Sequence, residues 1–383
     1  MKRILFILGI LGISFIGCKR DTSGDIMRYE CINISQPLVS PVKLSTLFDK
    51  IKFVKLETSS ENLLSDIRKV FSFEDLIVIG SGKSIFLFDP NGKFIKKIDR
   101  TGNGPEEYTR LSDFDINYSK REIAVLDKGL KQILFYDFEG NYIRNILFDF
   151  WAVKLKYLSD DKYLLYSGNE TSDNQGGKFT ILTSKGVECN FHKIDKNKSN
   201  YLHVNGLQNF YKNKDELLFN ESFNDTIYSK IDTVFIPKYV FSYDNMNIPK
   251  VFFEKSYANI MEFFQALNKT DYAYGVSSFM ETDENIYIGY QKSGLKHYAF
   301  YNKKNKNSNA FTSLVDDVSF TDVELPLPEE NFSFWPYQGK IMYFLESDWL
   351  MSHRDKIKSD QLKSLCNELS IDDNPVLVVN SIK

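Results

Sequence analysis

The stretch IFLFDPNGKFIKKI spans Ile85 to Ile98, and a second copy, ILFYDFEGNYIRNI, spans Ile133 to Ile146. In each copy an apolar strand is followed by an Asp-x-x-Gly turn and then by an alternating strand, which is the pattern of a β-hairpin. The Asp side chain accepts hydrogen bonds within the turn, and the Gly adopts a positive φ. The two stretches therefore predict one hairpin repeated along the chain.

The repeat is longer than the hairpin. Short apolar segments at 75–79 and 122–126 lead into the two copies, and further strand-like segments at 67–73 and 114–117 precede them. The unit is therefore four short strands within about 47 residues. Weaker copies follow at 163–194, 216–243, 285–312 and from 340 onward.

Four short strands per 40–50 residues are typical of a β-propeller blade, which buries its two faces only against neighbouring blades. We therefore predict an all-β fold, a six-bladed β-propeller of four-stranded antiparallel blades. Residues 375–379 are expected to close the ring by pairing with 53–57 in the last blade. Helical spacing of apolar residues in 251–268 and 355–368 predicts one or two inserted helices.

The N-terminus has the layout of a secretory signal peptide: a positive start, an uncharged stretch at 4–16, and then Gly17-Cys18. Phe15 to Cys18 resembles the lipobox of bacterial lipoproteins, which implies lipidation of Cys18; the alternative is an ordinary signal peptide cut elsewhere. We expect a lipoprotein signal peptide at 1–17, a lipid-anchored tether at 18–48 and the propeller at 49–383. The expected location is the cell envelope, on the periplasmic or surface face of the outer membrane.

The amino-acid composition argues against several classes of function. With 48 basic and 51 acidic residues the net charge is −3, so no nucleic-acid partner is expected. Aromatic residues make up 15% of the chain, which favours strands. Cys31, Cys189 and Cys366 contain no C-x-x-C pair and leave open whether a disulfide forms. Only four His occur, and neither a metal nor a cofactor is expected.

Several short patterns have ordinary structural explanations. The segment 80–84, GSGKS, lacks the first Gly and the following helix of a phosphate-binding loop, so it predicts a hairpin turn. The segment 113–117, DFDIN, lacks the Gly and Glu of a calcium loop and predicts a strand. No serine-hydrolase elbow or zinc-protease motif occurs, and no catalytic residue is assigned.

Three segments together resemble a known family. They are RTGNGPEEY at 100–108, NDTIY at 224–228 and DDNPVL at 372–377. The chain resembles the six-bladed β-propeller lipoproteins of gut-type anaerobic bacteria, which are relatives of the NHL-repeat propellers. The resemblance implies a turn between the first two blades made by Gly102, Gly104, Pro105, Glu107 and Tyr108. The family has no established common activity, so the resemblance indicates fold and location only.

Two functions from different classes remain open. The leading hypothesis is a non-catalytic binding or scaffold module for a glycan, peptide or partner protein. Trp151, Trp335 and Tyr337 are the candidate ligand-binding residues, because aromatic side chains at blade entries can face the axial opening. The alternative for these residues is packing in the core. The alternative is a propeller enzyme, such as a glycoside hydrolase or lyase, with carboxylates gathered at the axial face.

Overall fold

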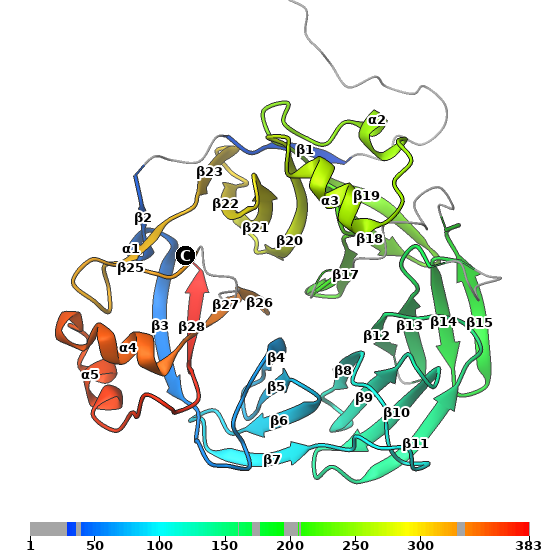
Figure 1. The fold of residues 1–383 in the computed structure, drawn as a ribbon, viewed down its shortest axis with the longest axis horizontal. Coiled ribbons are helices and arrows are strands. Elements are labelled where there is room, and N and C mark those ends of the chain that lie inside the picture. Colours follow the sequence, from blue (N-terminus) through cyan, green and yellow to red (C-terminus); the bar gives the residue numbers. More distant parts are fainter. Residues whose placement is uncertain are drawn as a thin grey trace, which may run out of the picture.

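The computed structural model describes residues 29–35, 40–159, 161–170, 177–194, 206, 208–327 and 334–382. These residues form seven β-sheets and a few short helices, and the larger sheets are arranged around a central axis (Figure 1). An all-β propeller of four-stranded antiparallel blades is therefore confirmed. The predicted signal peptide and Cys18 lie outside the described residues.

Sheets 1 to 3 each contain four antiparallel strands in chain order. Sheet 1 contains β4 (Ile67–Ser72), β5 (Ile77–Ser81), β6 (Ser84–Phe88) and β7 (Phe94–Ile98). Sheet 2 contains β8 (Asp113–Asn117), β9 (Glu122–Asp127), β10 (Gln132–Asp137) and β11 (Tyr142–Leu147). Sheet 3 contains β12 (Lys154–Ser159), β13 (Lys162–Tyr166), β14 (Phe179–Thr183) and β15 (Gly186–Phe191).

Sheets 4 and 5 continue the same order. Sheet 4 contains β16 (Phe210–Asn213), β17 (Glu216–Phe219), β18 (Thr226–Ile231) and β19 (Val234–Ser242). A fifth strand, β1 (Glu30–Asn33), pairs with β19 in parallel. Sheet 5 contains β20 (Ala273–Glu281), β21 (Asn285–Lys292), β22 (Leu295–Asn302) and β23 (Asn307–Phe311).

Sheet 6 closes the ring with strands from both ends of the chain. Its order is β26 (Trp335–Tyr337), β27 (Lys340–Leu345), β28 (Val376–Ile382) and then β3 (Phe48–Lys55). The β28 and β3 strands are antiparallel, with Leu377 opposite Val54 and Val378 opposite Phe53. The predicted pairing of the two chain ends in the last blade is therefore confirmed.

The predicted number of blades is wrong, because the structure has seven sheets rather than six. The additional sheet has three strands, β2 (Val42–Lys43), β24 (Leu314–Asp316) and β25 (Val323–Glu324). Strands of two or three residues are too short to show an alternating pattern in the sequence. The predicted tether at 18–48 is also too long, because β1, β2 and the start of β3 lie within it.

Helices lie at the margins of the sheets (Figure 1). The first, α1 (Leu44–Leu47), precedes β3. The predicted helical segment 251–268 contains α3 (Ile260–Leu267) and most of α2 (Lys250–Phe253). The segment 355–368 contains α5 (Asp360–Cys366), preceded by α4 (Ser347–Ser352) and a 3₁₀ turn at Arg354–Lys356. No helix among the described residues is both long enough and apolar enough to span a membrane.

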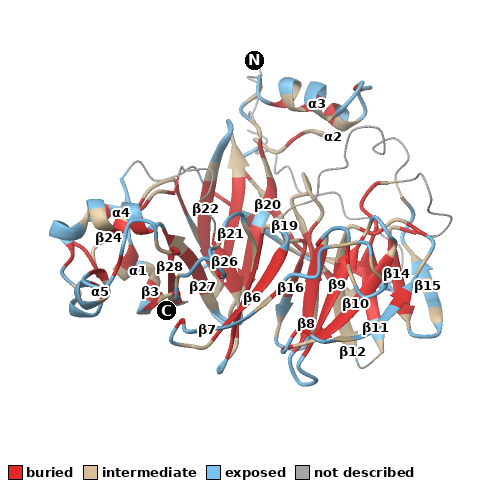
Figure 2. Cartoon of the chain, turned by 60° about the horizontal axis from the view of Figure 1, so that its bottom comes forward, coloured by how far each residue is buried: buried red, intermediate tan, exposed pale blue. Residues whose placement is uncertain are grey.

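The core lies between adjacent sheets (Figure 2). In β5 and β6 every residue is buried, whereas β7, the outermost strand of the same sheet, has exposed and half-buried residues. Inner strands are buried on both faces because a neighbouring sheet covers each side. The GSGKS segment forms the hairpin turn between β5 and β6, as predicted, with Gly82 at φ +56°.

The predicted turn at 100–108 joins sheets 1 and 2. The Glu107 carboxylate accepts a hydrogen bond from the Gly104 backbone N–H at 2.8 Å, and Tyr108 is fully buried. The Tyr108 hydroxyl donates to the Lys83 carbonyl at 2.8 Å. Arg100 crosses to sheet 2, where its guanidinium donates to the Gly140 carbonyl at 2.8 Å. This segment therefore holds two neighbouring sheets together.

Candidate ligand-binding site at the propeller axis

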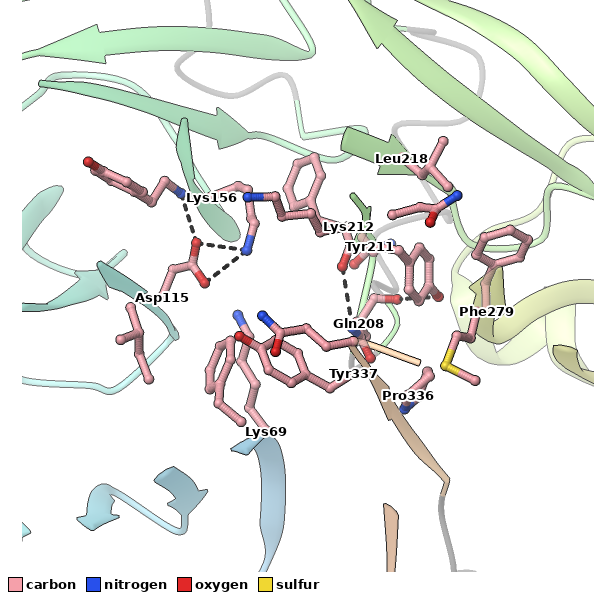
Figure 3. Close-up of a pocket in the computed structure, with 18 of the residues that line it drawn as sticks. Lys69, Asp115, Lys156, Gln208, Tyr211, Lys212, Leu218, Phe279, Pro336 and Tyr337 are labelled. Atoms are coloured by element: carbon pink, nitrogen blue, oxygen red, sulfur yellow. Dashed lines mark hydrogen bonds and ion pairs between the residues drawn. The ribbon is translucent and has the colours of Figure 1, made fainter. Parts of the chain in front are cut away.

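A cavity of about 400 Å³ lies at the axis of the ring. Its walls come from the innermost strand of each large sheet: β4, β8, β12, β16, β20 and β26. Because these strands surround the cavity, residues far apart in the sequence meet there (Figure 3). This cavity is the candidate site.

Asp115 and Lys156 form an ion pair on one wall. The carboxylate of Asp115, in β8, lies 3.0 Å from the ammonium group of Lys156, in β12 (Figure 3). The same carboxylate accepts a hydrogen bond from the Tyr157 backbone N–H at 2.8 Å. Asp115 therefore connects sheet 2 to sheet 3 at the axis.

Asp113, two residues earlier on the same strand, makes a matching set of contacts. Its carboxylate lies 2.9 Å from the ammonium group of Lys69 in β4 and accepts the Leu155 backbone N–H at 2.9 Å. Burial acts to raise the pKa of Asp113, but the charges of Lys69 and Lys154 outweigh it and hold that pKa below its usual value. Asp113 is therefore ionised at neutral pH.

Glu281 is the acidic residue on the opposite side of the cavity. Its carboxylate contacts Lys238 at 2.7 Å and Lys303 at 2.6 Å. Burial acts to raise its pKa, but these hydrogen bonds and one from Tyr239 lower it overall. A general acid needs a raised pKa, so neither Asp113 nor Glu281 is suited to that role at neutral pH.

Aromatic rings form much of the remaining wall. Phe73 and Tyr118 stack with ring centroids 4.2 Å apart, and Tyr337 packs edge-on against Phe71 and Phe73 at 5.5 and 5.7 Å. Lys212 points into the same space (Figure 3) and makes no ion pair with any described residue. The cavity therefore combines flat apolar surfaces with an available positive charge.

The three aromatic candidates from the sequence lie in three different environments. Tyr337 lines the axial cavity. Trp335 is 6% exposed and packs in the core between sheets 6 and 1, which corresponds to the alternative of core packing rather than to ligand binding. Trp151 lines a separate pocket. The structure therefore does not bring the three residues together.

The charged residues of the cavity were not predicted from the sequence. The segment 113–117 predicts only a plain strand, and the alternation of Asp113, Asp115 and Asn117 is the available signal. The partners of these residues are Lys69 and Lys156, more than 40 residues away on other sheets. Such a pairing becomes visible only when the blades are placed around their axis.

A protein-family model matches residues 30–381, which span nearly all of the described chain. The chain belongs to the family described as Domain of unknown function (DUF4934). No protein with curated annotation matches this DUF4934 chain.

Solved structures share the fold of this DUF4934 chain. A candidate exported protein from Bacteroides fragilis NCTC 9343 is 19% identical, with a TM-score of 0.74 over 92% of this chain and 100% of that chain. A member of the DUF4221 family from Bacteroides vulgatus is 11% identical, with a TM-score of 0.53 over 88% and 97% of the two chains. At these identities the likeness shows the fold alone.

Proposed function

We propose that this protein is a non-catalytic binding module of the cell envelope that holds its ligand in the axial cavity. The observation that carries the proposal is the composition of that cavity. The innermost strands of all the large sheets supply its walls, and aromatic rings and Lys212 line the same cavity. A volume of about 400 Å³ falls within the usual range for small-ligand sites.

The size and chemistry of the cavity favour certain ligands. An aromatic face packs well on a sugar ring or an apolar side chain, and the Lys212 ammonium can donate hydrogen bonds to its polar groups. The volume suits a small molecule, or the end of a glycan or peptide, rather than a folded domain. A partner protein would therefore be bound through an inserted segment.

Binding is tested with glycan and peptide arrays on the full chain, followed by titration of each hit. We expect Tyr337→Ala and Lys212→Ala to weaken binding at least tenfold, which corresponds to about 1.4 kcal/mol. Tyr29→Ala and Lys304→Ala are the matched controls, because these exposed side chains lie outside the cavity. Equal affinity of the cavity variants and the controls would contradict the proposal.

The proposed location rests on the N-terminal segment and on the candidate exported protein that shares the fold. We propose that Cys18 carries a lipid that anchors the protein to the outer membrane. Cys18→Ala is expected to move the protein from the membrane fraction to the soluble fraction, and mass spectrometry should show the loss of the lipid. Membrane fractionation with lipid still attached would exclude this anchor.

A glycoside hydrolase or lyase is the second candidate, favoured by the presence of Asp113, Asp115 and Glu281 in one cavity. All three carboxylates are engaged in ion pairs with lysines, which argues for a structural role. Prolonged incubation of the chain with each glycan hit separates the two functions. Binding without new reducing ends or unsaturated products is expected, and turnover that Asp115→Asn abolishes would favour the enzyme.

A further inference from the structure

A second pocket, of about 340 Å³, lies beside the beginnings of β4, β8 and β12. Four cationic side chains line it, and Glu170 is its only acidic lining residue within the described chain. The four are Arg68, Arg110, Lys128 and Lys154. The chain as a whole has a net charge of −3, so this local excess of positive charge is not visible in the composition.

The positive charges in this pocket are poorly compensated. Arg110 makes no ion pair with any described residue, and Arg68 has only the exposed Asp66, at 3.7 Å. Burial and the neighbouring charge of Arg110 both lower the pKa of Lys128. Crowded like charges of this kind are stabilised when an anion enters between them.

Two nearby acidic groups, Asp127 and Asp113, do not provide that compensation. Asp127, next to Lys128 in sequence, is fully buried, and its carboxylate accepts hydrogen bonds from the Thr109 and Gly129 backbone N–H groups at 2.7 and 2.9 Å. Asp113 faces Lys154 but already pairs with Lys69. The poorly compensated charges of this pocket are therefore those of Arg68, Arg110 and Lys128.

Ser167 supplies an independent observation. It lines the same pocket, is 1% exposed, and its hydroxyl has no hydrogen-bond partner among the described residues. Buried hydroxyl groups normally have a partner, and an oxygen atom of a bound ligand would provide one here. Trp151 forms another part of the wall. The Lys128 ammonium lies 5.3 Å from the centroid of its ring, and this contact helps to hold the Lys128 side chain in place.

We propose that this pocket binds an oxyanion: a carboxylate, sulfate or phosphate group held by Arg68, Arg110 and Lys128 and by the hydroxyl of Ser167. Guanidinium groups suit such ligands because their planar N–H donors match the spacing of two oxygens. The oxyanion can be a free inorganic ion or the charged group of a larger ligand. This site adjoins the axial cavity, with which it shares Lys154, and it extends the proposed function.

Calorimetric titration of the full chain at constant ionic strength tests this site with sodium sulfate, sodium phosphate and sodium glucuronate. Glucose is the uncharged match for glucuronate. We expect at least one anion to bind and glucose not to compete for the site. Sulfate or phosphate binding would indicate a free inorganic ion, whereas binding of glucuronate alone would indicate the charged group of an organic ligand.

Variants locate the site. Arg110→Gln combined with Lys128→Gln should weaken anion binding about 10- to 100-fold, since two charged hydrogen-bonding groups are lost. Lys304→Gln, which removes one exposed charge elsewhere, should leave it unchanged. Ser167→Ala should also weaken binding but leave the melting temperature unchanged, because no hydrogen bond within the described chain is lost.

Two results would overturn the proposal. One is that none of the three anions binds to the unchanged chain. The other is that the double variant binds the anion as tightly as the unchanged chain, whereas Lys212→Gln binds it more weakly. The anion would then occupy the axial cavity, which Lys212 lines.

Discussion

His297 lies buried in β22, with its ring stacked on Tyr290 at 5.2 Å between centroids. Its Nδ1 has no hydrogen-bond partner among the described residues. Burial, aided by the charge of Lys292, lowers its pKa to about 4. Asp225 is affected in the opposite direction, because burial raises its pKa to about 6. Protonation of His297 and protonation of Asp225 therefore each change the stability of the fold.

The sign for His297 follows from its lowered pKa. The unfolded chain takes up this proton near pH 6.5 and the folded chain only near pH 4, so stability is lost as the pH falls through that window. Between pH 7 and pH 4.5 the free energy of unfolding of the unchanged chain falls as His297 becomes harder to keep neutral. We expect this fall to be about 2–3 kcal/mol smaller in His297→Phe. Denaturant unfolding at several pH values measures this difference.

The unchanged chain is the control for His297→Phe in this experiment. Asp225 favours the folded state at low pH and contributes equally to both, so subtracting the two pH profiles isolates His297. Parallel profiles for His297→Phe and the unchanged chain would show that His297 does not titrate in this way.

At the scale of an element, the turn between sheets 1 and 2 is held by a side chain rather than by unusual backbone angles. Neither Gly102 nor Gly104 has φ in the left-handed region. Glu107 instead folds back over the turn, and a Cβ on Gly102 would overlap its Oε2. Gly102 is therefore required by close approach.

Gly102→Ala should force Glu107 away from the Gly104 N–H and cost about 1.5–3 kcal/mol, the contribution of a hydrogen bond to a charged group. Glu107→Ala should cost a similar amount. Adding Gly102→Ala to Glu107→Ala should then cost little, because the overlap no longer exists. Denaturant unfolding of this double-mutant cycle measures the coupling, and fully additive costs would contradict the explanation.

Elements with local signals could be predicted from the sequence. The Asp-x-x-Gly hairpins are one example, because Asp89 accepts the Lys93 N–H at 2.9 Å and Gly92 has φ +88°. The small seventh sheet was missed because its strands are too short to show a period. The charged residues of the axial cavity were missed because they come from different sheets, and their meeting depends on how many sheets close the ring.

At the scale of the whole molecule, the ring is held closed where the two ends of the chain meet. Asn374 is 1% exposed, and its side chain donates to the carbonyls of Glu57 and Asn62 at 2.9 and 3.1 Å. It also accepts the Leu64 backbone N–H at 2.8 Å. The side chains of Val54 and Val378 are buried beside this junction, at about 1.5–3 kcal/mol each.

Deleting all residues after Asn374 removes β28 and should therefore expose β3 as well. Hydrogen exchange followed by mass spectrometry should show that residues 48–55 lose amide protection in the truncated chain. Strands β9 and β10 are the internal control, because their hydrogen bonds lie wholly within sheet 2. If residues 48–55 stay as protected as in the full chain, β28 is not what holds β3.

The order of strands also determines how long the ring stays open during synthesis. The first three strands to emerge, β1, β2 and β3, pair with β19, β24 and β28, which are made some 200 to 330 residues later. Until residue 382 has been made, the ring stays open and β3 has an unpaired edge. A chain released early keeps that edge exposed, which gives proteases a means of distinguishing incomplete copies from finished ones.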